Sequence, residues 1–153
     1  MLGRLAKRLR LLGFDVLYDP TLDDNKIIHL ALEQDRKILT RDTALSRRPL
    51  AANHLFITHD RIDGQLREVF ALVLQCPVPR PLTRCSLCNT KLERIVRQEV
   101  RDRVPSHVYQ THTEFFQCPE CGRIYWKGTH IQRMVSAGLF VTSNQSTGEN
   151  LAL

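Results

Sequence analysis

Apolar side chains recur along the first 75 residues at spacings that predict alternating helices and strands. Residues 2–12 are predicted to form a helix, because apolar positions at helical spacing alternate with basic ones: Leu2, Leu5, Ala6, Leu9 and Leu12. Gly13 is suited to end this helix, since glycine adopts the left-handed backbone of a helix terminus without strain. The short apolar run at 14–18 favours a strand.

A second helix is predicted to begin after this strand. Asp23 or Asp24 can cap it, because a carboxylate accepts hydrogen bonds from the free N–H groups of a first turn. The expected buried stripe of this helix consists of Ile27, Ile28, Ala31 and Leu32.

Strands and helices continue to alternate through residue 75. Strands are predicted at 37–40 and 55–57, a short helix at 43–48 and a long helix at 64–75. The inward side chains of the long helix are Leu66, Val69, Phe70 and Val73. This alternation predicts an α/β fold, in which helices cover both faces of a parallel sheet. The pattern begins with a helix, however, whereas such a sheet normally begins with a strand.

Three prolines at alternate positions mark a boundary between two units. They lie in the segment PVPRPLT, residues 77–83, and favour an extended connector. We therefore expect an α/β domain over 1–76, a linker over 77–83, a cysteine-rich unit over 84–133 and a tail over 134–153. Within this tail, the small polar residues of 143–150 are typical of disorder.

The 153 residues have the composition of a globular protein and a formal net charge of +6. A basic surplus spread along the chain fits a polyanionic partner such as nucleic acid. No apolar run is long enough for a membrane span, and no N-terminal signal peptide is evident. We therefore expect a cytoplasmic location and no membrane partner, whereas protein partners and oligomeric state stay open.

Four of the five cysteines form two Cys-x-x-Cys pairs separated by 29 residues: Cys85, Cys88, Cys118 and Cys121. Two such turns can surround one tetrahedral ion, and we prefer this interpretation to a redox pair or unrelated thiols. Asn89 and Gly122, which follow the two pairs, tolerate the left-handed backbone that these turns need.

A shell of four thiolates has no open position, so we expect structural Zn²⁺ in a zinc ribbon. The ribbon strands are predicted within 92–97 and at 115–117. The fifth cysteine, Cys76, is interpreted as a small buried apolar residue.

Several aspartates follow predicted strands, where a parallel α/β sheet forms its sites. Asp23 and Asp24 open the second helix, Asp42 follows strand 37–40, and Asp60 follows strand 55–57. Carboxylates that meet at one edge repel each other unless a cation such as Mg²⁺ or Mn²⁺ neutralises them. An isolated aspartate is more often a cap or turn residue. A metal-dependent phosphoesterase and a non-catalytic nucleic-acid-binding protein therefore both stay open.

Basic and aromatic side chains provide two weaker signals. Arg4, Lys7, Arg8 and Arg10 are predicted to form a basic helix face, which either follows a phosphate backbone or is simply solvated. The aromatic residues of 125–130 can stack on bases, but in a unit this small they more often form the core or its contact with the first domain.

The sequence resembles a known family through motifs in both units. The N-terminal motifs are MLGRLAKRLRLLGFDVLY, DDNKIIHLA, ILTRD and Gln65-Leu66-Arg67. The later motifs are RCSLCNTKL, VRDRVP and FFQCPECGRIYWKGTH. Together they cover about residues 1–133 and resemble the PIN-like ribonuclease domain found at the C-terminus of the mutator-seven exonucleases.

The resemblance implies a PIN-like, Rossmann-like fold with a metal-dependent ribonuclease site, followed by a zinc ribbon. In that family an acidic cluster holds Mg²⁺ or Mn²⁺ and RNA is cut. Asp24 matches the acid that opens the second helix, with Asp23 the less favoured neighbour. Asp42 matches the strand-end acid, and Asp60 is a looser match for a further one.

The same motif match assigns roles to two neighbours of Asp42 and leaves one position without a counterpart. Thr40 is expected to orient Asp42, and Arg41 to contact phosphate. The family has a central strand before the first helix that ends in a metal-binding Asp, and the sequence opens at Met1, where that strand should end. Either an upstream segment is missing or the chain is a degenerate member, and a chain complete as given is expected to have weak or no nuclease activity.

Overall fold

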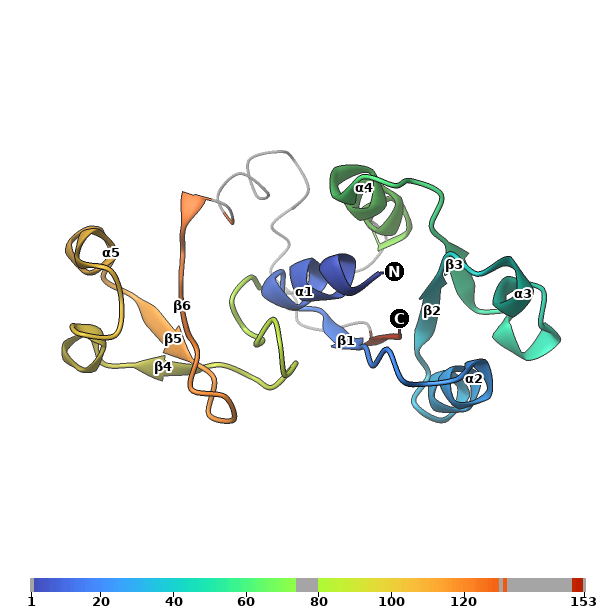
Figure 1. Ribbon diagram of the computed structural model, residues 1–153, viewed down its shortest axis with the longest axis horizontal. Coiled ribbons are helices and arrows are strands. Elements are labelled where there is room, and N and C mark those ends of the chain that lie inside the picture. The colour runs from blue at the N-terminus through green and yellow to red at the C-terminus, as the bar shows by residue number, and fades with distance from the viewer. Residues whose placement is uncertain (1, 74–79, 130, 132–149, 153) are drawn as a thin grey trace.

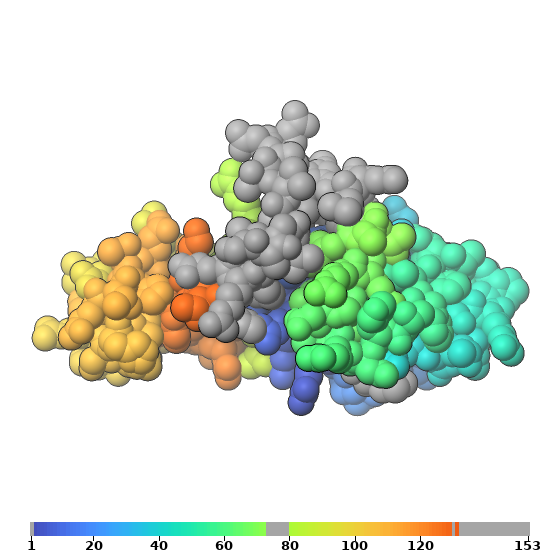
Figure 2. All heavy atoms as spheres, turned by 90° about the horizontal axis from the view of Figure 1, so that it is seen from above, coloured from blue at the N-terminus to red at the C-terminus, as the bar shows by residue number. Residues whose placement is uncertain are grey.

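The structure, a computed structural model, describes residues 2–73, 80–129, 131 and 150–152. These residues form two β-sheets with helix α1 (Gly3–Leu11) between them (Figure 1). Viewed from above, the blue N-terminal residues likewise lie between the cyan and green residues at one end and the yellow and orange residues at the other (Figure 2).

The larger sheet is parallel and has the strand order β1-β7-β2-β3. Its strands and the helices around it are β1 (Asp15–Leu17), α2 (Asp24–Glu33), β2 (Lys37–Thr40), α3 (Thr43–Ser46), the 3-10 helix η1 (Pro49–Ala51), β3 (His54–Phe56), α4 (Ile62–Val73) and β7 (Asn150–Ala152). The predicted parallel α/β fold is confirmed. Where the sequence predicted both ends of a helix or strand within residues 2–75, each predicted end lies within two residues of the observed end.

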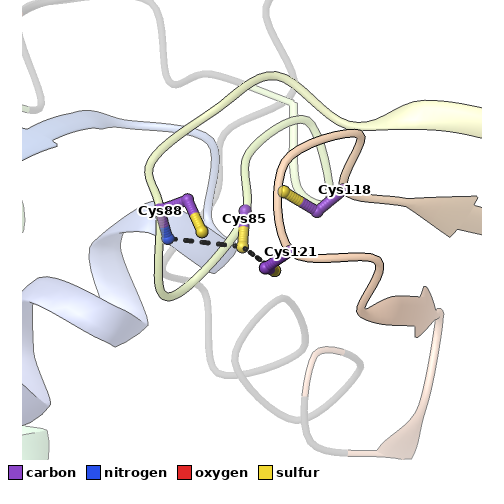
Figure 3. Close-up of side chains that lie close together, drawn as sticks. All are labelled: Cys85, Cys88, Cys118 and Cys121. Carbon is purple, nitrogen blue, oxygen red and sulfur yellow. Dashed lines mark hydrogen bonds between the residues drawn. The ribbon is translucent and has the colours of Figure 1, made fainter.

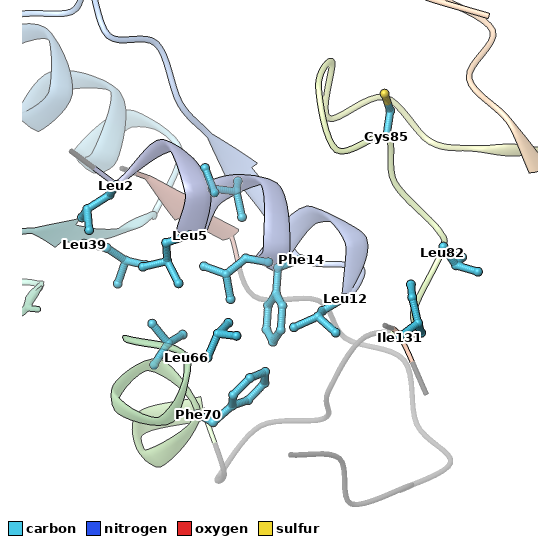
Figure 4. Close-up of a cluster of buried hydrophobic side chains, with 14 of the residues drawn as sticks. Leu2, Leu5, Leu12, Phe14, Leu39, Leu66, Phe70, Leu82, Cys85 and Ile131 are labelled. Carbon is cyan, nitrogen blue, oxygen red and sulfur yellow. The ribbon is translucent and has the colours of Figure 1, made fainter. Parts of the chain in front are cut away.

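Adjacent residues of β2 face opposite sides of the sheet and belong to separate apolar clusters. Leu39 lies in the cluster that contains Leu5 of α1 and Leu66 of α4. Figure 4 shows these side chains between the two helices. Ile38 lies in the cluster that contains Ile28 of α2. Helices therefore cover both faces of the sheet, as the alternation of strands and helices predicts.

Local sequence signals set the ends of these helices. Gly13 follows α1 with a φ of +96°, in the left-handed region that favours glycine. Asp23 caps α2, because its carboxylate accepts a hydrogen bond of 2.9 Å from the backbone N–H of Lys26. One prediction for α2 is wrong: Leu32 is 60% exposed and lines an open hollow of about 520 Å³ between α2 and η1. Nothing in the described part of the chain covers this side chain.

The C-terminal strand β7 was not predicted from the sequence. Its backbone pairs in parallel with both neighbours, with Leu151 opposite Val16 of β1 and Lys37 of β2. The place between β1 and β2 is therefore filled by residues 150–152. Residues 132–149, which include most of the segment predicted to be disordered, lie outside the described residues.

The smaller sheet is antiparallel, with the order β4-β5-β6. Its elements are β4 (Glu93–Ile95), η2 (Arg97–Val100), α5 (Ser106–Thr111), β5 (Phe115–Gln117) and β6 (Ile124–Trp126). The two predicted ribbon strands are confirmed as β4 and β5. A small core of Val100, Val108 and Phe115 lies beneath them.

One apolar cluster joins the two units. Leu82, Cys85, Cys118 and Tyr125 lie in the same buried cluster as the side chains of α1. Tyr125 thus contributes to the contact between the units, which is the structural alternative weighed for the aromatic segment. Residues 74–79, which include Cys76 and much of the predicted linker, lie outside the described residues, so the domain boundaries stay a prediction.

Candidate functional site

The four paired cysteines lie around one point, as the sequence predicts. Their Sγ atoms all lie within 4.8 Å of one another, and those of Cys85 and Cys121 are 3.7 Å apart. Figure 3 shows the four side chains converging from two loops. Zn–S bonds of about 2.3 Å place the sulfurs of a tetrahedral site about 3.8 Å apart. The donor set and its spacing therefore fit a metal ion held by four thiolates.

The two cysteine turns share one backbone design. In the first, Asn89 N–H donates to the carbonyl of Cys85 and has a φ of +67°. In the second, Gly122 N–H donates to the carbonyl of Cys118 and has a φ of +70°. The left-handed backbone predicted for Asn89 and Gly122 is confirmed, and it turns both sulfurs of each pair toward the common centre.

Hydrogen bonds lower the pKa of one of the thiols. Burial alone would raise the pKa of Cys85, but hydrogen bonds from the N–H of Cys88 and the hydroxyl of Tyr125 lower it to about 6. Burial and the neighbouring thiols raise the pKa of Cys88 to about 12. A thiolate at Cys85 is thus available to bind a metal ion.

The predicted acidic residues lie at the ends of parallel strands. Asp42, just after β2, caps α3: its Oδ1 accepts from the N–H groups of Ala44 at 2.7 Å and Leu45 at 3.1 Å. Both bonds use the same oxygen, so Oδ2 has no hydrogen-bond or ion-pair partner among the described residues. One carboxylate oxygen of Asp42 is therefore free to bind an ion.

Asp24 and Asp23 differ in how far their carboxylate oxygens are already engaged by other groups. Asp24 is the first residue of α2, and its carboxylate has no hydrogen-bond or ion-pair partner in the part of the chain that the structure describes. Asp23 uses Oδ1 to cap α2 and places Oδ2 3.9 Å from Nζ of Lys26. The carboxylate of Asp24 is thus less engaged by neighbouring groups than that of Asp23, although Asp23 is the more exposed residue.

The fourth predicted acid, Asp60, is paired with a predicted phosphate-binding residue. Nη2 of Arg41 lies 2.5 Å from Oδ1 of Asp60. Thr40 acts on the backbone of Asp42, because its hydroxyl accepts a 3.0 Å bond from the N–H of Asp42. The four aspartates do not form a cluster of this kind. Among the described residues, three or more potential metal ligands lie within 4.8 Å of one another at the cysteines and not at the aspartates.

The predicted basic face of α1 contains three residues. Arg4 and Lys7 are exposed, and Arg8 is half-buried near Asp63. The prediction for Arg10 is wrong, since its side chain is 6% exposed and bonded to carbonyl groups. Arg10 is four residues after the buried Ala6, so the helical repeat places it on the inner side of α1.

Comparison with protein families identifies the chain. The profile described as "Mut7-C RNAse domain" matches residues 1–137. The chain belongs to this family. Searches of curated proteins and of solved structures each gave no match.

The Mut7-C RNAse domain match includes strands β1, β2 and β3 of the parallel sheet together with the cysteine site, so the family comprises parts of both units. Strand β7, at residues 150–152, lies outside the matched region. Among the described residues of this Mut7-C domain, no helix is long and apolar enough to cross a membrane.

One polar network in this Mut7-C domain was missed from the sequence. Glu68 of α4 accepts bonds from Thr58 N–H at 3.0 Å and His59 N–H at 3.4 Å, and its Oε1 lies 2.8 Å from Nδ1 of His59. Burial alone would raise the pKa of Glu68, but hydrogen bonds from the Thr58 hydroxyl, the His59 ring and the two N–H groups lower it to about 2. The ring of His59 lies against Gly64, where a Cβ would be 2.5 Å away. Glu68 and Gly64 therefore fix the loop that carries Asp60, and no motif of the sequence pointed to Glu68.

Proposed function

We propose that this chain is a metal-dependent ribonuclease that hydrolyses RNA phosphodiester bonds at the carboxyl edge of the larger sheet. Membership of the Mut7-C RNAse domain family supports RNA as the substrate. The proposal is carried by the order of the elements: Asp24 and Asp42 follow β1 and β2 toward the same edge of the parallel sheet, and each has a carboxylate oxygen without a partner among the described residues.

The donor set fits Mg²⁺ or Mn²⁺. These ions prefer oxygen ligands, and Mg²⁺ commonly uses one or two carboxylates together with water and substrate phosphate oxygens. A hydrogen bond of 2.6 Å from Nη2 of Arg48 to Oδ1 of Asn25 ties the first turn of α2 to the segment after α3. This bond brings together the helix that Asp24 opens and the helix that Asp42 caps.

The residues around these carboxylates have separate roles in the proposed site. A divalent ion at this edge supplies the activation of water and the neutralisation of phosphate charge that hydrolysis requires. Asp24 and Asp42 hold the ion, with Asp23 as an auxiliary acid. Arg41 contacts the phosphate after its guanidinium releases the exposed carboxylate of Asp60. The RNA backbone is bound by Arg4, Lys7 and Arg8. The cysteine site is assigned to structural Zn²⁺, because four thiolates leave no position for water.

Cleavage of a labelled single-stranded RNA by the zinc-loaded protein tests the proposal. Mn²⁺ is added or left out, since a chelator would also remove the ion from the cysteine site. We expect cleavage only with Mn²⁺, and a loss of at least about 100-fold in Asp42→Asn, because asparagine keeps the helix cap and loses the charge. Asp35→Asn, at the opposite edge of the sheet before β2, is the matched control and should keep full activity.

A second candidate function is an RNA-binding module without catalysis. It is favoured by the structural contacts that three of the acids make: Asp42 and Asp23 cap helices, and Asp60 pairs with Arg41. In that case the RNA is bound with equal affinity by the wild type and Asp42→Asn, and no Mn²⁺-dependent cleavage occurs in either.

A further inference from the structure

The first cysteine turn, residues 85–89, packs directly against α1 and β1. Cys85 is fully buried in the cluster formed by the inner side chains of α1, including Leu5 and Leu9. Just before the turn, the N–H of Leu82 donates a 2.9 Å bond to the carbonyl of Leu11, at the end of α1. Figure 4 shows Leu82 and Cys85 on one segment beside the helix. One half of the metal site thus belongs to the core of the α/β unit.

Arg10 joins α1 to the turn. Its Nε donates 2.9 Å to the carbonyl of Val16 in β1, and its Nη1 donates 2.6 Å to the carbonyl of Leu87 and 3.3 Å to that of Ser86. A buried guanidinium needs such partners, because removing a charge from water is costly. Ser86 and Leu87 lie between the two metal-ligating cysteines of the turn, so the position of Arg10 depends on how the turn is folded.

Asn89 joins the turn to β1. Its Oδ1 accepts a 3.1 Å bond from the N–H of Val16, and its Nδ2 donates 2.7 Å to Oδ1 of Asp15. Asp15 also lies 3.1 Å from Nη2 of Arg84 and 3.2 Å from Nη1 of Arg36. Strand β1 is an edge strand of the sheet, and the amide of Asn89 satisfies a backbone group on its open side.

Bound metal ions stabilise cysteine turns of this kind. A turn that brings two thiolates to one point is held by the ion, and ligand turns of small metal sites lose their structure without it. Helix α1 carries the α1 basic face, which consists of Arg4, Lys7 and Arg8.

We propose that a metal ion in the cysteine site fixes α1 through residues 85–89, so that RNA binding by the α1 basic face depends on metal occupancy. The RNA part rests on the function proposed above, whereas the link between the metal site and α1 does not. The binding partner is a polyanionic RNA backbone, and the regulating ligand is the ion.

Hydrogen exchange of the full chain, with and without zinc, tests the link itself. We expect peptides that cover α1 and β1 to exchange at least about tenfold faster after the metal is removed. Peptides that cover α2 and α3 should change little, because their core of Ile28, Ala31, Ile38, Leu45 and Ala51 is separate. Unchanged exchange in α1 would overturn the proposal.

A pair of variants tests the link with the metal still bound. Asn89→Gly keeps the left-handed turn, as Gly122 does in the second turn, but removes both bonds to β1. Gly122→Asn is the matched control, since an added Cβ would meet only Nε2 of Gln117 at 3.8 Å. We expect faster exchange of α1 and β1 in zinc-loaded Asn89→Gly and wild-type exchange in Gly122→Asn. If removal of zinc unfolds the whole chain, the comparison of these two zinc-loaded variants tests the link instead. Equal exchange of α1 and β1 in both variants contradicts the proposal.

Binding of a non-cleavable 2′-O-methyl oligoribonucleotide, measured by fluorescence anisotropy, tests the RNA part. We expect affinity to fall about tenfold or more both in zinc-free protein and in zinc-loaded Asn89→Gly, as when two or three phosphate contacts are lost. Equal affinity with and without zinc, despite faster exchange of α1, would overturn metal-dependent binding. No binding by the zinc-loaded wild type would instead contradict the proposed function and leave the exchange result to stand.

Discussion

The hydroxyl group of Tyr125 lies where the two cysteine-bearing segments meet. It contacts Sγ of Cys85 at 3.1 Å and accepts a bond of 3.1 Å from the N–H of Ser86. Burial, together with the bond to Cys85, raises the pKa of Tyr125 to about 12, so the hydroxyl keeps its proton and can donate it to the sulfur. A single group on β6 therefore stabilises the thiolate of a ligand on the opposite turn.

Tyr125→Phe is expected to weaken metal binding about 10- to 100-fold, as loss of a group that supports a metal ligand commonly does. The ring still fills its place in the core, but Cys85 loses a hydrogen bond that lowers its pKa. Competition with a chromophoric chelator measures the affinity. Tyr109→Phe, in the separate ribbon core, is the control, and equal affinities in all three proteins would contradict this role.

Glu68 gives a pH-dependent contribution to stability. Its pKa is lowered from 4.5 to about 2, so its stabilising effect is fully present above pH 4.5 and is lost as the pH falls through about 2. We expect Glu68→Gln to lower the free energy of unfolding by about 1–2 kcal/mol at pH 7, with the difference from wild type disappearing toward pH 2. Urea unfolding at several pH values measures this, and Glu114→Gln, in an exposed pair with Arg94, should show no such difference.

At the scale of elements, one of the two inner positions of the larger sheet is taken by a strand that follows both units in the sequence. Strand β7 pairs on both sides, so β1 and β2 are joined through its backbone. A strand with two neighbours needs all of its N–H groups, which proline cannot supply. The stability of the sheet thus depends on residues far from it in sequence.

Leu151→Pro is expected to destabilise the protein by about 1–3 kcal/mol, because it removes a donor from an inner strand. Leu151→Ala keeps the N–H group and separates backbone from side-chain effects. Thermal unfolding and hydrogen exchange of β1 and β2 measure the outcome. Equal stability of Leu151→Pro and Leu151→Ala would show that residues 150–152 do not pair as described.

Element by element, the sequence predicted what local patterns encode. The helical repeat identified α1, and turn chemistry identified Gly13, Asn89 and Gly122, because a left-handed backbone restricts the residue type. Strand β7 was not predicted, since three residues carry too little pattern and their pairing depends on distant segments. Arg10 and Asn89 were missed as linking residues for the same reason, since their partners lie more than 70 residues away.

At the scale of the whole molecule, the two units share one buried cluster that includes Leu9, Cys85 and Tyr125. Shared burial couples the unfolding of neighbouring units. The only tryptophan, Trp126, lies in β6, whereas most helical residues belong to the α/β unit. Fluorescence and far-ultraviolet circular dichroism therefore report on different ends of the molecule.

We expect zinc-loaded protein to unfold in a single transition, with the same urea midpoint by both probes. Two separate midpoints would show that the units are independent. Leu82→Ala, which trims the shared cluster, should lower the common midpoint and should begin to separate the two curves.

Binding of Mn²⁺ to zinc-loaded protein, followed by the electron paramagnetic resonance signal of free Mn²⁺, tests the central claim most directly. The account predicts one saturable Mn²⁺ site that is weakened in Asp24→Asn and Asp42→Asn and unchanged in Asp35→Asn. Equal binding in all four proteins, or no saturable binding in the wild type, would contradict a metal site at the carboxyl edge of the sheet.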